Sequence, residues 1–322
     1  MATTSEPQTL SDAVVYFRNP DNCLNFLVAR RWPNGVECPT CGSKDVGFVA
    51  SRRVWQCKTR HPKAQFSVKL GTIFEDSPLG LDKWLPAMWM IGSNRNGISS
   101  WELHRALGVT QKTAWFMLHR IRLAMQDEGN GGKLGGEVEV DETYIGGKSR
   151  NMHKSVRERR IMSPGPDGKA IVMAVLERHG VVRPKVVHAA SQKELQGHIR
   201  ENVLAGSEVF TDAHPGYFGL DEEYAHEVID HAVAYVEGNV HTNGLENFWS
   251  LLKRSLKGTY VSVEPFHLFR YVDEQAFRFN NRKPVSDADR FSYLVRKAVG
   301  KRLTYAELTG KVGQKQPGDE PF

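Results

Sequence analysis

Three acidic residues in the middle of the chain have the residue types and the settings of a metal site. Asp141 follows the alternating run 137–140, and Asp212 ends an apolar run that begins at Val209. Glu246 lies near the start of a segment with helical spacing. Two Asp residues at strand ends and a Glu on a helix, gathered in space, can hold two divalent cations, an arrangement common in phosphodiester hydrolysis and transfer. The three acids therefore predict metal-dependent chemistry, with Mg²⁺ favoured because every ligand is a carboxylate and Mn²⁺ as a substitute.

Each of these acids also has an ordinary structural interpretation. Asp141 could belong to a turn at a strand end, with Glu139 or Glu142 as the functional acid. We favour Asp141 because alternation along a strand places Glu142 on the opposite face. Asp212 could cap the turn that follows it, and Glu246 could simply stabilise the N-terminus of a helix. We favour the metal site, because the alternative requires all three ordinary interpretations to hold at the same time.

Three cysteines and one histidine have the spacing of a zinc ligand set. Cys38 and Cys41 are separated by two residues and followed by Gly42, so both thiolates can face one ion. Cys57 and His61 are separated by three residues, and fifteen residues lie between the two pairs. These four side chains predict a structural Zn²⁺ site. The alternative is that the second pair consists of ordinary residues near a turn.

Zinc is expected to supply folding energy to this part of the chain. The segment 36–75 is too short to bury a sufficient apolar core by itself. Its role could be contact with DNA or with protein. The fourth cysteine, Cys23, lies in an apolar helical segment and is predicted to be a buried free thiol.

A helix, a glycine turn and a second helix are predicted between residues 99 and 125. The segments 99–107 and 110–125 have helical spacing, and Gly108 lies between them. This is the pattern of a helix-turn-helix, whose second helix lies in the major groove of DNA. A plain helical hairpin in a protein core is the alternative. The side chains expected to face DNA are Gln111, Lys112, Thr113, His119, Arg120 and Arg122.

Positive charge is concentrated in the same part of the chain. The 322 residues carry a formal net charge of +6, yet residues 28–125 contain fifteen Lys or Arg against six acidic residues. Such a local excess is expected of a protein that binds a polyanion, although a solvated basic surface is the alternative. No apolar run of about 18 residues and no secretory signal is apparent. We therefore expect a cytoplasmic protein.

The elements that must position the acids form a mixed α/β pattern. Strands are predicted at 137–145, 170–177, 181–189, 208–211 and 224–229, and helices at 192–204, 245–257 and 266–279. The order predicts a mixed sheet with helices on its faces. It is the order of a ribonuclease-H-like domain, in which adjacent strands bring two acids together and a later helix supplies the third.

The sequence divides into five predicted regions. A glycine-rich linker at 129–132 separates the basic helical part from the strands. The regions are an N-terminal helical segment (1–35), a zinc ribbon (36–75), a helix-turn-helix region (76–130), a ribonuclease-H-like catalytic domain (131–285) and C-terminal helices with a tail (286–322).

Longer motifs cover nearly the whole chain in a fixed order. They are CPTC at 38–41, QFS at 65–67, GTIF at 71–74, GVTQKTAW at 108–115, VDETYIGG at 140–147, TD at 211–212 and HTNGLENFWSLLKR at 241–254. Together they resemble the zinc-ribbon insertion-sequence transposases of the ISXO type, which have a DDE catalytic domain. The resemblance implies that Asp141, Asp212 and Glu246 bind the catalytic metals, with Asn243 as the alternative third ligand. It also implies that Lys253, two turns after Glu246 on the same helical face, contacts a DNA phosphate.

The resemblance further implies an activity and partners. The enzyme would cut at transposon ends and join them to target DNA with two metal ions, working in a prokaryotic cytoplasm and at the nucleoid when bound. Its partners would be double-stranded DNA and further copies of the chain in the complex of two ends. A non-catalytic DNA-binding regulator is the main alternative, and a glycosidase that uses two of the acids is a weaker one. The later basic residues Arg254, Lys257, Arg270, Arg278 and Arg282 either follow DNA or form a solvated face.

Overall fold

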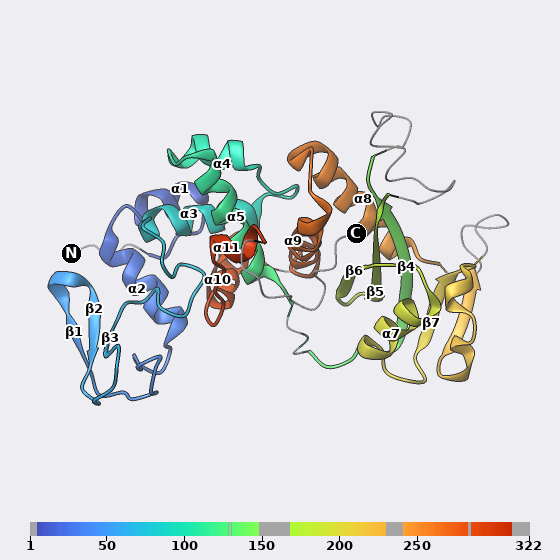
Figure 1. Cartoon of the computed structure of the whole chain (residues 1–322), viewed down its shortest axis with the longest axis horizontal. Helices are drawn as coiled ribbons and strands as arrows, with labels where there is room; N and C mark the ends of the chain where they lie inside the picture. Colours follow the sequence, from blue (N-terminus) through green and yellow to red (C-terminus); the bar gives the residue numbers. More distant parts are fainter. Residues whose placement is uncertain are drawn as a thin grey trace. The chain divides into compact units, whose positions relative to one another are not determined.

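The chain folds into two compact units, which are described separately below. In this computed structural model the first unit contains Met1–Gln126 and Asn281–Asp319, and the second contains Asp127–Asn280 (Figure 1). The structure describes residues 5–127, 129, 131–147, 168–229, 241–282 and 285–310. The tail predicted at 313–322 lies outside these residues.

Helices from both ends of the sequence build the first unit. They are α1 (Leu10–Tyr16), α2 (Pro20–Arg31), α3 (Leu81–Ser93), α4 (Ser100–Leu107), α5 (Gln111–Met125), α10 (Asp287–Lys297) and α11 (Tyr305–Leu308). Helix α2 begins anew after α1 because Pro20 occupies its first position and Asn19 accepts a hydrogen bond from the N–H of Asp21 (2.9 Å). Phe291 of α10 packs on Phe26 and Trp89, with ring centroids 5.4 and 4.8 Å apart. Helix α10, from the C-terminal part of the chain, therefore completes the core of the first unit.

A small antiparallel sheet follows α2. Its strands are β1 (Val46–Val49), β2 (Val54–Cys57) and β3 (Gln65–Phe66), with the short 3₁₀ helix η1 (Ala50–Arg52) between the first two. Trp55 of β2 stacks on Phe66 of β3, and Trp32 packs edge-on against both rings. Three aromatic side chains thus form most of a core too small to be stable without further support.

A five-stranded mixed sheet forms the second unit. Its strands are β4 (Glu137–Ile145), β5 (Ala170–Glu177), β6 (Val182–Val187), β7 (Glu208–Asp212) and β8 (Ala225–Ile229), in the order β6-β5-β4-β7-β8. The pairs β4–β5 and β5–β6 are antiparallel, whereas β4–β7 and β7–β8 are parallel. The mixed α/β architecture predicted from the sequence is confirmed, with strands close to the five expected.

Helices cover both faces of this sheet (Figure 1). The helical elements are α7 (Gln192–Asn202), η3 (Pro215–Tyr217), η4 (Leu220–Glu222), α8 (Asn243–Ser255), the π-helix η5 (Leu256–Tyr260), η6 (Pro265–His267) and α9 (Leu268–Asn280). Val172 and Ala174 of β5 pack in one core with α8 and α9, while Met173 and Val175 pack in another with α7. Alternation along one strand therefore supplies both cores.

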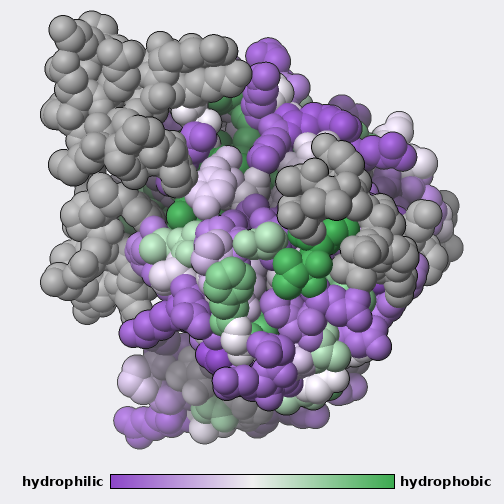
Figure 2. Space-filling view, turned by 90° about the vertical axis from the view of Figure 1, so that its right-hand side faces the viewer, coloured by the Kyte–Doolittle hydropathy of each residue, from purple (hydrophilic) through white to green (hydrophobic). Residues whose placement is uncertain are grey.

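The surface of the second unit is mainly hydrophilic on the side shown in Figure 2, where hydrophobic residues form small separate groups. Exposed hydrophobic side chains near its outer strands include Phe218 and Val228. Isolated exposed residues of this kind are common on protein surfaces. Within the described part of the chain, no helix is both long and apolar enough to cross a membrane.

Candidate metal centres

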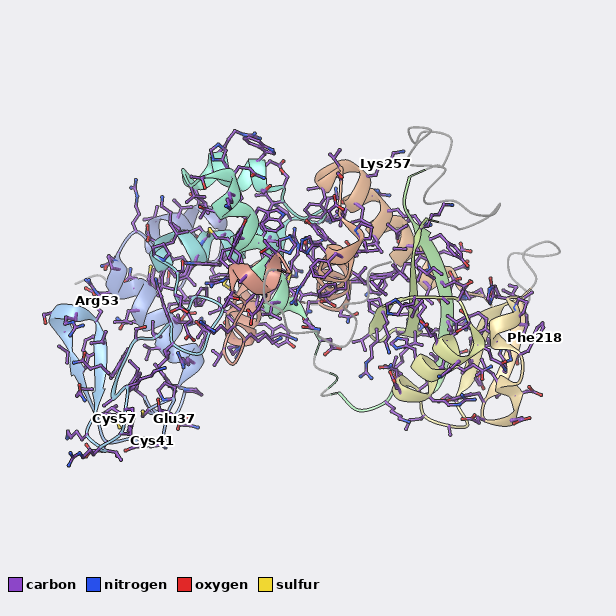
Figure 3. The ribbon with its side chains drawn as sticks, viewed as in Figure 1. Glu37, Cys41, Arg53, Cys57, Phe218 and Lys257 are labelled. Atoms are coloured by element: carbon purple, nitrogen blue, oxygen red, sulfur yellow. The ribbon has the colours of Figure 1, made fainter. Side chains whose placement is uncertain are left out.

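The predicted zinc ligands lie together at one end of the small sheet. Cys38 and Cys41 come from a turn before β1, which closes when the N–H of Gly42 donates to the carbonyl of Cys38 (2.8 Å). Gly42 has a φ of +73°, which a glycine adopts without strain. Cys57 ends β2. Figure 3 shows Cys41 and Cys57 at this end of the sheet and Arg53 at the turn on the other end.

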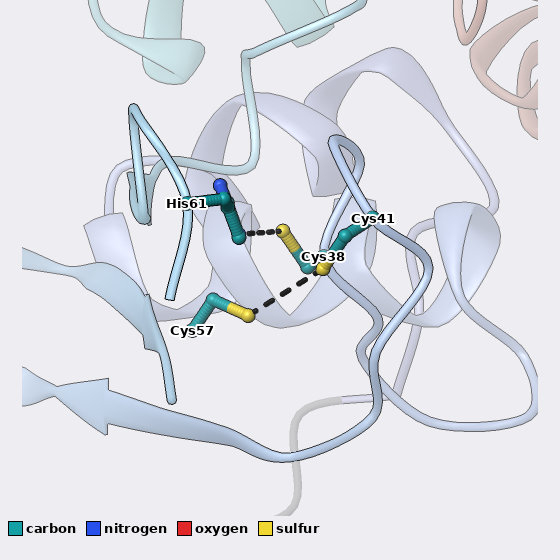
Figure 4. Close-up of side chains that lie close together, drawn as sticks. All are labelled: Cys38, Cys41, Cys57 and His61. Atoms are coloured by element: carbon teal, nitrogen blue, oxygen red, sulfur yellow. Dashed lines mark hydrogen bonds between the residues drawn. The ribbon is translucent and has the colours of Figure 1, made fainter. Parts of the chain in front are cut away.

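The four ligand atoms have the spacing of a tetrahedral zinc site (Figure 4). All lie within 4.8 Å of one another, with Sγ of Cys38 3.4 Å from Nε2 of His61 and the two sulfurs of Cys41 and Cys57 3.7 Å apart. Zn–S bonds of about 2.3 Å in tetrahedral geometry place two sulfurs about 3.8 Å apart. The side chains therefore fit a zinc ion without rearrangement.

Hydrogen bonds prepare these ligands for a cation. Burial raises the pKa of Cys38, but backbone N–H groups of Cys41 and Thr40 outweigh it and lower that pKa to about 6. Nδ1 of His61 donates to the carbonyl of Pro62 (2.7 Å), which leaves Nε2 facing the sulfurs. This bond is the largest cause that raises the pKa of His61 to about 9, followed by the Cys57 side chain. A fixed tautomer of this kind is typical of zinc-bound histidine.

Cys23 lies outside this cluster, as predicted. Its thiol is buried and donates to the carbonyl of Phe17 (3.1 Å), and burial raises its pKa to about 12. It is therefore an inert core residue.

Asp141 and Asp212 lie on two adjacent parallel strands, with Asp212 at the end of β7 and Asp141 in the middle of β4. The expectation that Asp141 ends its strand is wrong, because β4 continues to Ile145 in its pairing with β5. The register pairs Glu137 with Glu208 and Glu139 with Phe210, and its continuation by two residues brings Asp141 opposite Asp212. The indole N–H of Trp249 in α8 donates to Oδ2 of Asp141 (2.9 Å), so this carboxylate lies on the α8 face of the sheet.

Glu142 lies on the opposite face, as alternation predicts. Its Oε2 accepts a hydrogen bond from the hydroxyl of Tyr217 in η3 (2.5 Å), and His214 lies 3.9 Å from its other oxygen. The two neighbouring acids of β4 therefore have different helices as partners, and only Asp141 faces α8.

The negative charges of Asp141, Glu142 and Asp212 repel one another. Burial raises the pKa of Asp141 to about 7, the negative charges of Glu142 and Asp212 add to the effect, and the Trp249 hydrogen bond reduces it. Burial also raises the pKa of Glu142, with Asp212 contributing and the Tyr217 hydrogen bond opposing. Partly buried carboxylates that repel one another are the groups whose charge a bound cation would stabilise.

Glu246 and Lys253 are both exposed on α8. Trp249 lies three residues after the first and four before the second, so the three side chains share one side of the helix. The structure thus places Glu246 and Lys253 on either side of the residue that contacts Asp141.

The three predicted catalytic carboxylates are not gathered into one ligand set. Among the described residues, the Cys/His cluster is the single group of three or more candidate ligands close enough to hold an ion. Asp141 and Asp212 lie opposite each other and affect each other electrostatically, but they do not form such a group with Glu246.

Glu139 is a residue whose importance the sequence did not reveal. It was one alternative for the functional acid, but its side chain is only 2% exposed and is fully engaged. It accepts a hydrogen bond from the N–H of Leu245 (3.0 Å) and pairs with Arg178 and His241, each at 3.3 Å. Its position two residues before Asp141, on the same strand face, is the signal that could have identified it.

The expectation that the second helix of the helix-turn-helix is basic along its length is wrong. His119 and Arg122 are fully buried, and Arg120 is 4% exposed. Arg120 donates to the backbone carbonyls of Leu303, Ile73 and Glu75 at 2.7–3.0 Å. Arg120 therefore ties α5 to other parts of the first unit, and none of the three buried side chains is available to DNA.

The start of the same helix keeps the predicted features. Thr110 caps α5 by accepting from the N–H of Thr113 (3.1 Å), and Gly108 ends α4 with a φ of +64°. Lys112 is exposed, and Gln111 and Thr113 are half-buried.

The later basic residues separate into two kinds. Arg278 is buried and ion-paired with the buried Glu274, so it belongs to the core. Arg254 near the end of α8 and Lys257 in η5 are exposed, and Figure 3 labels Lys257.

Comparisons with known proteins cover both candidate centres. The ISXO2-like transposase domain matches residues 133–280, and the transposase zinc-ribbon domain matches residues 18–59. The uncharacterized protein in transposable element ISH50 of Halobacterium salinarum is 31% identical over 288 residues, which cover 84% of this chain and 95% of that protein. No solved structure matches the chain significantly. The sequence relationship and the two matched domains together show that the chain belongs to the zinc-ribbon, ISXO2-like family of DDE transposases.

Proposed function

We propose that this protein is an active insertion-sequence transposase that binds the ends of its element and catalyses phosphodiester hydrolysis and DNA strand transfer. The observation that carries the proposal is the placement of Asp141 and Asp212 side by side on adjacent parallel strands, next to a helix that bears Glu246 and Lys253. The strand order β6-β5-β4-β7-β8, with three antiparallel strands followed by two parallel ones, supports a ribonuclease-H-like fold for this domain.

Asp141, Asp212 and Glu246 would hold two Mg²⁺ ions, for which Mn²⁺ could substitute. Their oxygen donors suit these hard cations, and the repulsion between the carboxylates of the two strands favours positive charge there. Among the described residues, the side chain of Glu246 makes no hydrogen bond or ion pair, so it can turn towards the other two without breaking one. When bound, the ions would activate a water or a 3′-hydroxyl and stabilise the leaving oxygen.

The protein's own groups would orient the substrate. Lys253 would bind a phosphate near the reacting bond, as expected of an exposed ammonium on the same side of α8 as Glu246. Trp249 would hold Oδ2 of Asp141 while the backbone N–H of Glu142 holds Oδ1 (2.8 Å), so both oxygens are oriented and each keeps a lone pair for a cation.

DNA recognition would fall to the first unit. The helix-turn-helix within 76–130 presents Lys112, Gln111 and Thr113 at the start of α5, and the zinc ribbon lies within 36–75. Double-stranded transposon ends and target DNA are the proposed partners, with more than one copy of the chain in the complex of two ends. Such an enzyme would work in a prokaryotic cytoplasm, at the nucleoid.

Cleavage of a labelled duplex that carries the terminal repeats of the flanking element tests the proposal. Wild type, Asp212→Asn and the control Glu208→Gln, an exposed acid at the other end of β7, would be compared in Mg²⁺ and in Mn²⁺. We expect cutting at the repeat end by wild type and control, and none by Asp212→Asn. Binding without cutting in either metal would favour a non-catalytic regulator, and cutting by Asp212→Asn would refute the assignment of this acid.

A further inference from the structure

The start of helix α8 is capped by a residue from the sheet. The residue before the helix, Thr242, makes no side-chain capping hydrogen bond. Instead, Oε2 of Glu139 accepts from the N–H of Leu245, the third residue of the helix, at 3.0 Å. Free N–H groups in the first turn of a helix require an acceptor, and a local Ser, Thr, Asn or Asp normally supplies it. Here the acceptor comes from β4, more than a hundred residues earlier.

The Glu139 carboxylate is held from several sides. Its other oxygen lies 3.3 Å from Nε of Arg178 and 3.3 Å from Nδ1 of His241. Arg178 in turn donates to the carbonyl of His241 (3.0 Å), just before α8. The nearby positive charge offsets the cost of burying the Glu139 carboxylate.

Gly244 allows the helix to approach the sheet at this point. A Cβ atom at this position would lie 2.5 Å from Cδ2 of Leu176 and 2.7 Å from Oε2 of Glu139. Any larger residue would therefore displace the helix from the strand. The close approach explains why a glycine stands next to Leu245 in the first turn of α8.

Glu139 and Asp141 make two matched contacts with α8. On β4 they are two residues apart on one face, a distance of about 6.6 Å. Their partners, Leu245 and Trp249, are four residues apart on the helix, a rise of about 6 Å. Because the two distances agree, the two hydrogen bonds fix both the position of α8 along the strand and its rotation about its own axis.

We propose that Glu139 is a positioning residue that sets the orientation of α8, and thereby directs Glu246 and Lys253 towards Asp141 and Asp212. This inference rests on the proposed function of those residues. Glu139 itself touches neither metal nor DNA, since it is buried and its oxygens are engaged.

Two substitutions separate the position of the acceptor from its charge. Glu139→Asp keeps the charge but withdraws the carboxylate by one methylene group, whereas Glu139→Gln keeps the length and one acceptor oxygen. The matched control is Glu137→Asp, because Glu137 also pairs with Arg178 (3.2 Å) but is more exposed than Glu139.

Hydrogen exchange of the full-length protein, without divalent cations other than zinc, measures the contact directly. We expect the amides of the first turn of α8 to exchange about five-fold faster in Glu139→Asp, the size of effect of a lost helix cap. Glu139→Gln should change the rate much less, and Glu137→Asp should not change it. Unchanged exchange in Glu139→Asp, or a larger effect of Gln than of Asp, would overturn the proposal.

The metal dependence of cleavage tests the consequence for the site. For Glu139→Asp we expect the Mg²⁺ concentration at half-maximal cleavage to rise about ten-fold, as for other residues that orient metal ligands, with activity recovered at high Mg²⁺. Faster exchange with an unchanged Mg²⁺ requirement would reduce Glu139 to a purely structural residue. If the wild type does not cut DNA at all, the proposed function fails, while hydrogen exchange still decides whether Glu139 holds α8.

Discussion

The zinc site and the carboxylate site differ in how far their side chains are assembled without an ion. The ligand atoms of Cys38, Cys41, Cys57 and His61 already lie within 4.8 Å of one another. Asp141 and Asp212 lie side by side on neighbouring strands, but they do not form a similarly close group with Glu246. The first site is closed and local, whereas the second draws on strands and a helix far apart in the sequence.

Charge explains much of this difference. Thiols and an imidazole can share protons and hydrogen bonds, so the four zinc ligands can approach one another before the metal binds. Carboxylates only repel one another when ionised, and burial makes the repulsion stronger, as the raised pKa of Asp141 indicates. A set of cysteines and a histidine can therefore gather more closely than a set of carboxylates.

Loss of a zinc ligand should give the largest effect. In Cys57→Ser we expect the zinc to be lost and the small sheet β1–β3 to unfold, because zinc binding contributes on the order of 10 kcal/mol in small zinc domains. Zinc content and limited proteolysis of residues 36–66 would measure this. Cys23→Ala, which alters the cysteine outside the cluster, should keep one zinc per chain. A fully protected ribbon in zinc-free Cys57→Ser would show that the aromatic core suffices.

Removal of Asp141 should abolish catalysis without affecting the zinc site. We expect Asp141→Asn to slow cleavage at least about a thousand-fold, since two-metal catalysis depends on transition-state stabilisation of several kcal/mol. Single-turnover cleavage rates at saturating Mg²⁺ and a zinc assay would be measured together. Cleavage within ten-fold of wild type would assign the metal to other residues.

The same substitution should stabilise the metal-free protein in a pH-dependent way. The folded-state pKa of Asp141 is raised from its ordinary value of 3.8 to about 7. Below pH 4 the Asp141 carboxyl is protonated in both the folded and the unfolded protein, so its burial does not lower the free energy of unfolding. As the pH rises towards 7, the carboxyl ionises in the unfolded protein but stays protonated in the folded protein, so the free energy of unfolding falls.

Asp141→Asn should therefore be more stable than wild type at pH 8, by at most roughly 4 kcal/mol at about 1.4 kcal/mol per pH unit, and equal to it near pH 4. Urea unfolding followed by hydrogen exchange of β4, without divalent cations other than zinc, would measure the difference. Glu208→Gln should show no such pH dependence. An Asn variant that is no more stable at pH 8 would contradict burial as the cause.

The smallest predicted effect concerns the indole hydrogen bond. Trp249→Phe removes a donor worth about 1 kcal/mol to Asp141, so the pKa of this carboxyl should rise further, by roughly 0.7. The pH at which the metal-free protein loses stability should shift upwards by the same amount. Phe248→Leu, which alters the neighbouring buried side chain, should lower stability without moving that pH. If Trp249→Phe and Phe248→Leu lose stability at the same pH, the indole does not influence Asp141.

Local spacing was enough to predict much of both sites. The zinc ligand set, the faces of Asp141 and Glu142, and the glycine turn between α4 and α5 all follow from distances of a few residues along the chain. Periodicity works at this range because neighbouring side chains are fixed relative to one another by the helix or strand itself.

Which basic side chains are buried depended on contacts that local spacing could not identify. Arg120, predicted to face DNA, instead donates to carbonyls of residues 73, 75 and 303, and Arg278 pairs with Glu274 inside the core. A periodic pattern tells which side chains share a helical face, but not whether water, DNA or another segment covers that face. The placement of α10 in the N-terminal unit has the same origin.

The sequence by itself determined which residues could bind zinc, which acids lie on the central strands, and the mixed α/β class of the second unit. Only the tertiary structure decided that Glu139 caps α8 and that Trp249 holds Asp141. These features depend on a contact between β4 and a helix that begins more than a hundred residues later. Such contacts arise from packing and desolvation, which short-range spacing does not encode.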